Sequence, residues 1–156
     1  MGNHASDTAV RFYADADPSL LKYAVIAARC RGKWVLCRHR ERRTWEMPGG
    51  HREPEEKIEH AARRELFEET GALRYALTRI GVYSVTGEIN GGREFFGMLY
   101  FAEIETLGPL PPYEMAEITF LDGLPGNLTY PEIHPALFLR ALRFLGEKGN
   151  NLKGES

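Results

Sequence analysis

Residues 50–73 place three acidic side chains on one edge of a predicted helix, a pattern that limits the possible chemistry of this chain strongly. At 100° per residue, Glu65, Glu68 and Glu69 fall within an arc of about 100°. That arc overlaps an apolar stripe, which consists of Ile58, Ala61, Ala62 and Leu66. Crowded carboxylates repel one another and resist burial, so a helix selected only for stability would avoid them. Because Mg²⁺ binds carboxylate, water and phosphate oxygens, the segment indicates a site for Mg²⁺ and phosphate on a helix edge.

The same segment resembles the Nudix box, a Gly, five residues, a Glu, seven residues and then Arg-Glu-aliphatic-x-Glu-Glu-x-Gly-aliphatic. The matching positions are Gly50, Glu56, Arg64, Glu65, Leu66, Glu68, Glu69 and Gly71. Ala72 is a mild departure, because a larger aliphatic residue is usual there. From average residue usage, a chance match in a chain of this length has a probability of about one in 10⁸. The resemblance implies a Nudix-type α/β/α sandwich with a mixed β-sheet, a fold of the α/β class.

The resemblance also implies a metal site and a residue that orients it. The cofactor is Mg²⁺, for which Mn²⁺ can substitute, and the implied ligands are the carbonyl of Gly49 and the carboxylates of Glu56, Glu65, Glu68 and Glu69. Glycine suits this role because it lets the backbone come close to a ligand, and a carbonyl oxygen binds hard cations. Arg64 matches the position that orients the catalytic carboxylates, although a simple surface ion pair is the alternative.

The general base varies within the family, and the motif leaves Glu65 and Glu114 as candidates. Members often carry an additional Glu in the loop before the strand that follows residue 112. Glu114 is the first candidate for that position and Glu117 the second, and the alternative for either is an exposed acid on a loop.

Three residues are candidates for substrate binding. Arg38 and Arg40 belong to a basic loop over residues 38–43, and an arginine side chain matches phosphate oxygens in pairs. The alternative is a solvated hairpin end. Asn127 offers a donor and an acceptor to the edge of a purine, but an asparagine that stabilises a turn is the alternative.

The order of periodic segments predicts one domain with a sheet between helices. Strands are expected over residues 22–30, 33–38, 74–86 and 93–104, with a short strand within 113–121, and helices over 57–70 and 131–145. Gly71 is expected to end the first helix. The domain is expected to span residues 21–146, between an N-terminal tail over 1–20 and a disordered C-terminal tail over 147–156.

Composition restricts the partners of the chain. Twenty basic and 22 acidic residues are mixed, with a net charge of −2, so no broad basic surface favours duplex nucleic acid. Cys30 and Cys37 fall on apolar strands and are expected to be free core thiols, which favours the cytoplasm. No run of about 18 apolar residues predicts a membrane span. The sequence leaves a monomer and a homodimer equally open.

The predicted activity is Mg²⁺-dependent cleavage of the phosphoanhydride in nucleoside diphosphate-X compounds. The short domain resembles the MutT-type branch, which implies a small nucleotide substrate: a nucleoside triphosphate cleaved to monophosphate and pyrophosphate, with oxidised purines such as 8-oxo-dGTP among the candidates. The alternatives are ADP-ribose, dinucleoside polyphosphates, and the 5′-pyrophosphate of RNA. A non-catalytic nucleotide-binding module is a further alternative, but the complete set of carboxylates argues against it.

Overall fold

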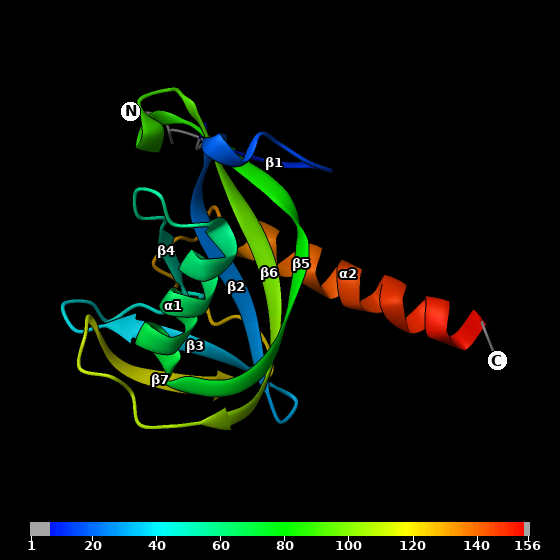
Figure 1. Ribbon diagram of the computed structural model, residues 1–156. Helices are drawn as coiled ribbons and strands as arrows, with labels where there is room; N and C mark the ends of the chain where they lie inside the picture. The colour runs from blue at the N-terminus through cyan, green and yellow to red at the C-terminus, as the bar shows by residue number, and fades with distance from the viewer. Residues whose placement is uncertain (1–6, 155–156) are drawn as a thin grey trace.

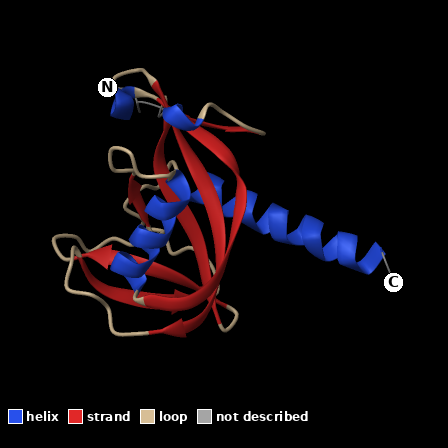
Figure 2. Cartoon of the chain, in the orientation of Figure 1, coloured by secondary structure: helices blue, strands red, loops and turns tan. Residues whose placement is uncertain are grey.

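The structure is a computed structural model that describes residues 7–154, with side chains described over residues 7–147. Within that part of the chain, a seven-stranded mixed sheet lies between helices α1 (Ile58–Thr70) and α2 (His134–Gly154) (Figure 1). Figure 2 shows the strands as one curved layer with a helix on each side. This arrangement confirms the predicted α/β/α sandwich with a mixed sheet.

The strands follow the order β1-β5-β6-β2-β3-β7, and β4 pairs separately with β2. Their bounds are β1 (Ala9–Tyr13), β2 (Leu21–Cys30), β3 (Lys33–His39), β4 (Gly49–His51), β5 (Ala72–Thr86), β6 (Glu94–Leu107) and β7 (Met115–Leu121). Two short 3-10 helices, η1 (Pro18–Leu20) and η2 (Glu88–Asn90), lie between strands. Only β2 and β6 pair in parallel among these strands, and the other pairs are antiparallel.

Both faces of the central sheet are apolar because each is covered by a helix. Along β2, Ala24, Ile26 and Ala28 belong to the core beneath α1, which contains Leu66. The alternate residues of β2 belong to the core beneath α2, which contains Leu137. Side chains of a strand alternate between its two faces, so a continuous apolar run is what a strand covered on both sides requires.

Two turns fix the ends of these elements. Arg31 and Gly32 both have positive φ, 52° and 79°, and join β2 to β3 in the predicted hairpin. Gly71 has φ of 80° and its N–H bonds to the carbonyl of Phe67 at 2.8 Å, so it ends α1 as predicted. A Cβ there would lie 2.7 Å from the carbonyl oxygen of Pro109, which excludes other residues sterically. The free, buried thiols of Cys30 and Cys37 also agree with the prediction.

The two ends of the chain differ from the prediction. Residues 9–13, expected in an irregular tail, form β1, which pairs with β5 at the sheet edge while Val10 packs on the core beneath α2. Helix α2 begins at His134 rather than residue 131, and it continues to Gly154 through residues predicted to be disordered. Extending a helix that already packs on a sheet is easier than nucleating one, which accounts for the extra turns. Residues 1–6 and 155–156 of the predicted tails lie outside the described residues.

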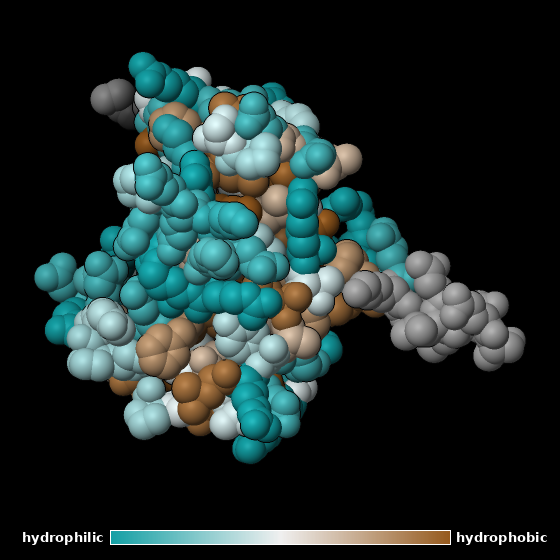
Figure 3. All heavy atoms as spheres, in the orientation of Figure 1, coloured by the Kyte–Doolittle hydropathy of each residue, from teal (hydrophilic) through white to brown (hydrophobic). Residues whose placement is uncertain are grey.

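No helix in residues 7–154 combines the length and apolar character that crossing a membrane requires. In the space-filling view, hydrophilic side chains gather over α1 on the face turned to the viewer (Figure 3). Helix α1, which carries Glu65, Glu68 and Glu69, therefore lies on a hydrophilic face of the molecule.

Candidate active site

Strand β4 and helix α1 bring two glycines against two carboxylates. The N–H of Gly49 donates to Oε1 of Glu69 at 2.7 Å. A Cβ on Gly50 would lie 2.6 Å from Cδ of Glu65, so this position is open to the carboxylate only because glycine occupies it. The pairing of β4 with β2 holds both glycines in place.

Arg64 links Glu56, in the loop before α1, to two carboxylates of α1. Its Nε and Nη2 donate to the two oxygens of Glu56 at 2.8 and 2.9 Å, a paired contact. Its Nη1 donates to Oε1 of Glu65 at 2.8 Å and lies 3.5 Å from Oε2 of Glu68. Nη2 also donates to the carbonyl of His51 at 3.0 Å. One guanidinium thus fixes the geometry of three acids and attaches them to β4.

The carboxylates differ in how readily they lose a proton. Burial raises the pKa of Glu69 to about 9, against the lowering effect of the Gly49 N–H. Burial also raises the pKa of Glu65 to about 7, although Arg64 opposes the shift and the charges of Glu68 and Glu114 add to it. By contrast, the hydrogen bond from Arg64 is the main reason that the pKa of Glu56 falls to about 2. A divalent cation would relieve the crowding at Glu65 and Glu69, because it favours the ionised forms.

The donor set fits a hard divalent cation, although the side chains do not yet surround one. Within the described residues, no three His, Cys, Asp or Glu side chains stand in an arrangement able to hold an ion. Arg64 and the Gly49 N–H engage the carboxylate oxygens of Glu56, Glu65 and Glu69 instead. All the predicted ligands nevertheless come from β4, α1 and the loop between them, and all are oxygen donors, which Mg²⁺ and Mn²⁺ prefer.

The two candidate acids near β7 lie in different surroundings. The charge of Glu114 acts on both Glu65 and Glu69, and its backbone carbonyl accepts from the N–H of Arg40 at 3.0 Å. Glu117 instead accepts from Nε of Arg38 at 2.8 Å across the β3–β7 pair. The structure thus brings Glu114 near Glu65 and Glu69, whereas Glu117 pairs with Arg38. The catalytic role of each stays a prediction.

The three predicted substrate-binding residues make local contacts. Besides its bond to Glu117, Arg38 donates from Nη1 to the carbonyl of Arg42 at 2.8 Å. Arg40 donates to the carbonyl of Tyr113, and Asn127 donates to the carbonyl of Arg43 at 3.2 Å. None of the three lines the cavity that lies beside β4. Their contact with a substrate remains a prediction.

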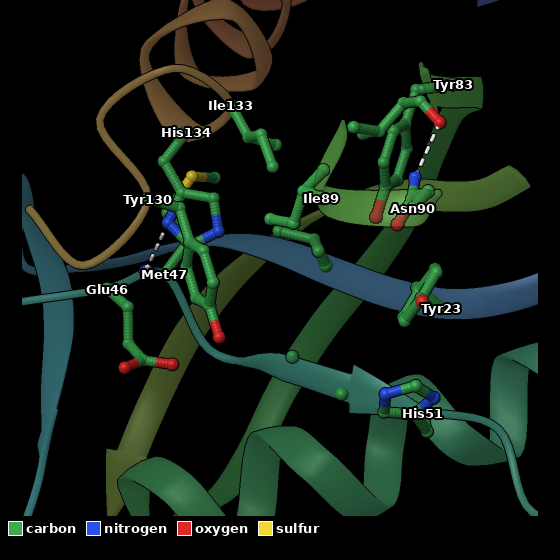
Figure 4. A pocket seen from close by; sticks show the side chains of 14 residues that line it. Tyr23, Glu46, Met47, His51, Tyr83, Ile89, Asn90, Tyr130, Ile133 and His134 are labelled. Atoms are coloured by element: carbon green, nitrogen blue, oxygen red, sulfur yellow. Dashed lines mark hydrogen bonds between the residues drawn. The ribbon is translucent and has the colours of Figure 1, made fainter. Parts of the chain in front are cut away.

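A cavity of about 310 Å³ lies beside β4 (Figure 4). Its walls are mainly aromatic and apolar, and they comprise Tyr23, Val25, Glu46, Met47, Gly49, Gly50, His51, Tyr83, Val85, Ile89, Asn90, Tyr130, Ile133 and His134. Figure 4 shows Glu46, Tyr130 and His134 toward one end and Tyr23 with His51 toward the other. Gly49 and Gly50 belong to this wall and also touch the carboxylates of α1.

Sequence reasoning missed most of this cavity because its residues come from separate segments of the chain. Aromatic residues such as Tyr23 and Tyr130 belong to no motif that would mark them as part of a site. Glu46 offered a local signal, since it is an acid between the apolar residues Trp45 and Met47. An acid in such a position indicates either a buried ion pair or a ligand contact.

Comparison with known proteins identifies sequence relatives. A family model described as the NUDIX domain matches residues 20–136. A relative from Bacillus subtilis (strain 168), named "Putative 8-oxo-dGTP diphosphatase YtkD", is 39% identical over 109 residues, which cover 69% of this chain and 66% of that protein. A second protein of that strain, named "Putative 8-oxo-dGTP diphosphatase", is 35% identical over 65 residues, or 42% of this chain and 44% of its own length. The chain thus matches less than two thirds of either relative.

Solved structures share the fold. The crystal structure of the Bacillus subtilis pyrophosphohydrolase BsRppH has a TM-score of 0.73 and 30% identity, and the match covers 96% of this chain and 98% of that one. The MutT NUDIX hydrolase from Burkholderia pseudomallei has a TM-score of 0.59 at 23% identity, covering 76% of this chain and 95% of that one, a likeness of fold alone.

Proposed function

This chain belongs to the Nudix family of phosphoanhydride hydrolases, and from that membership we propose that it hydrolyses nucleoside 5′-triphosphates to a nucleoside monophosphate and pyrophosphate. The observation that carries the proposal is the shared position of Gly49 and Gly50. On one side they contact the carboxylates of α1, and on the other they line the cavity. A nucleotide needs such an arrangement, with an apolar site for its base beside an acidic, cation-binding site for its phosphates.

The volume and the lining of the cavity suit a nucleotide base. Its volume of about 310 Å³ is that of a small-molecule site, and its walls provide aromatic faces for a flat ring. The names of the two Bacillus subtilis relatives refer to 8-oxo-dGTP, which keeps oxidised purine triphosphates among the candidate substrates.

The acids near β4 and α1, together with Arg64, would bind the metal ion, orient its ligands and take the proton of the attacking water. Gly49, Glu56, Glu65, Glu68 and Glu69 are the proposed ligands of Mg²⁺, for which Mn²⁺ can substitute. When bound, the ion neutralises phosphate oxygens and so lets water attack phosphorus. Arg64 holds Glu56 and Glu65 in fixed positions relative to β4. Glu65 or Glu114 accepts the proton of the attacking water, whose oxygen forms the new P–O bond as the phosphoanhydride breaks.

A substrate panel tests this proposal. Release of phosphate and pyrophosphate would be measured from dGTP, dATP, 8-oxo-dGTP, ADP-ribose, a dinucleoside polyphosphate and a 5′-triphosphorylated RNA, with Mg²⁺, Mn²⁺ or chelator. We expect metal-dependent pyrophosphate release from the free triphosphates. Glu68→Gln should abolish it, whereas Glu59→Gln should not, since Glu59 is an exposed acid of α1 that pairs only loosely with Arg63 at 3.7 Å.

The panel also separates the alternatives. Faster cleavage of ADP-ribose, the dinucleotide or the RNA than of any free triphosphate would refute the substrate class and keep the hydrolase chemistry. Nucleotide binding without release of phosphate or pyrophosphate from any compound would refute catalysis itself.

A further inference from the structure

The cavity contains a single carboxylate among its described lining residues, that of Glu46. The residue is 7% exposed, and its backbone pairs with Cys37 of β3 through two hydrogen bonds of 2.9 Å. The two backbone bonds fix where the residue sits, and its burial leaves the side chain little room to turn toward solvent. Its carboxylate therefore forms a fixed part of the cavity wall.

The protein neighbours of Glu46 leave part of its hydrogen-bonding capacity free. Arg42 approaches Oε1 with Nη1 at 3.4 Å, a long contact from a half-exposed side chain. The side chain of Thr129, which also bonds to Thr44, and the charge of His39 lower the pKa of Glu46 further. A carboxylate can accept about four hydrogen bonds. Burying a carboxylate with so few partners costs stability, and burial accordingly raises the pKa of Glu46. A ligand with N–H donors would offset that cost.

The other groups at this end of the cavity are two rings, whose faces can stack on a flat base. His134 accepts the N–H of Met47 on Nδ1 at 3.1 Å, so its proton lies on Nε2. Tyr130 packs on His134 with ring centroids 5.1 Å apart. Figure 4 shows Glu46 beside these two rings. A flat base held between apolar walls would thus meet one strong acceptor at its edge.

We propose that Glu46 selects purine bases that present two adjacent N–H donors on one edge, as guanine does with N1–H and its 2-amino group. The inference rests on the proposed triphosphatase function, because it concerns the base of the same substrate. A carboxylate accepts both donors together, whereas adenine would place the lone pair of N1 against a carboxylate oxygen. 8-Oxoguanine keeps both donors, so Glu46 would bind it through the same two hydrogen bonds as guanine. Hypoxanthine keeps only N1–H.

Substrate analogues test the inference on the unaltered protein. We expect kcat/KM to fall about 10-fold from dGTP to dITP, which lacks the 2-amino group, and further to dATP, because each lost charge-assisted hydrogen bond weakens binding. Calorimetric affinities for dGMP, dIMP and dAMP should follow the same order. Equal values across the three bases in both measurements would overturn the role of Glu46.

A substitution adds a change of preference that a merely structural role would not produce. In Glu46→Gln the amide offers one acceptor and one donor, so it can no longer accept N1–H and the 2-amino group of guanine together, whereas it can pair with N1 and the 6-amino group of adenine. The dGTP/dATP ratio of kcat/KM should fall at least about 10-fold, with Glu59→Gln as the control, because Glu59 is an exposed acid of α1 that does not line the cavity. An equal loss on every nucleotide would place Glu46 with the cation-binding acids and overturn the inference, as would an unchanged ratio.

The two proposals fail separately. If the unaltered protein hydrolyses triphosphates without preference among bases, the inference fails and the proposed function stands. If it hydrolyses no triphosphate, the proposed function fails, and the monophosphate affinities of the unaltered protein and of Glu46→Gln still decide whether Glu46 selects the base.

Discussion

Arg64 shows how one residue can organise a site that is otherwise all acid. It contacts Glu56, Glu65 and Glu68 and also the carbonyl of His51, so the α1 carboxylates and β4 share one positive charge. The paired geometry at Glu56 depends on the planar guanidinium, which a lysine ammonium does not reproduce.

Arg64→Lys should therefore reduce kcat by about 10- to 100-fold, the usual effect of losing a residue that orients metal ligands. Arg63→Lys is the matched control, because Arg63 directly precedes Arg64 on α1, is exposed and forms its ion pair with Glu59 at 3.7 Å, away from the acids that Arg64 contacts. Steady-state kinetics with saturating Mg²⁺ would measure the effect. Equal kcat values in the two variants would exclude an orienting role for Arg64.

Gly50 acts through the space it leaves free. In Gly50→Ala the new Cβ would lie 2.6 Å from the carboxylate carbon of Glu65, so that carboxylate must move. We expect kcat/KM to fall on the order of 100-fold, because misplacement of a reacting group by about 1 Å has effects of that size. Gly123→Ala is the control, since a Cβ there meets nothing within 4 Å. Matching activities of the two variants would contradict this prediction.

At the scale of helices and strands, local patterns predicted what local contacts determine. The bounds of α1, its end at Gly71 and the β2–β3 hairpin follow from periodicity and turn residues close in sequence. The grouping of acids along α1 follows from helical spacing alone. Strand β1 was not predicted because its place depends on pairing with β5, whose paired residues lie 69 to 77 positions further along the chain. The cavity was not predicted for the same reason, since segments far apart in the sequence form its walls.

The start of α2 joins that helix to the cavity through His134. Burial lowers the pKa of His134 from 6.5 to about 4, so the folded protein holds this imidazole neutral. Between about pH 6.5 and pH 4 the unfolded chain binds the extra proton, and the folded state loses stability as the pH falls through this range. The stability present above pH 6.5 declines by about 3 kcal/mol across it, from a shift of this size.

The pH dependence of unfolding by urea measures this contribution. His134→Gln removes the titrating group while keeping an acceptor for the Met47 N–H, so the stability of the variant should fall less between pH 6.5 and pH 4. His60→Gln, at an exposed position of α1, should keep the behaviour of the unaltered protein. Parallel curves for the His134 and His60 variants would show that His134 is not the group responsible.

At the scale of the whole molecule, the sandwich holds an unfavourable arrangement of acids that Arg64 offsets only in part and that a bound cation would offset further. The sheet and α1 hold Glu65 and Glu69 in partly or fully buried positions, where burial first, and then the charges of neighbouring acids, raise the pKa of both. Unfolding would separate these acids and hydrate them. Any cation that binds the folded arrangement alone must therefore stabilise the fold as it prepares the site for substrate.

Mg²⁺ should accordingly raise the thermal midpoint of unfolding in the absence of nucleotide. At a free concentration tenfold above its dissociation constant, the linkage gives about 1.4 kcal/mol, or about 3 to 6 °C for a domain of this size. Scanning calorimetry with Mg²⁺ and with chelator would measure the shift, which Glu68→Gln should reduce and Glu59→Gln should retain. Na⁺ at matched ionic strength controls for screening of surface charge. An equal shift with Na⁺, or one unaffected by Glu68→Gln, would mean that the acids of α1 do not bind the ion, and the metal site would have to be sought elsewhere.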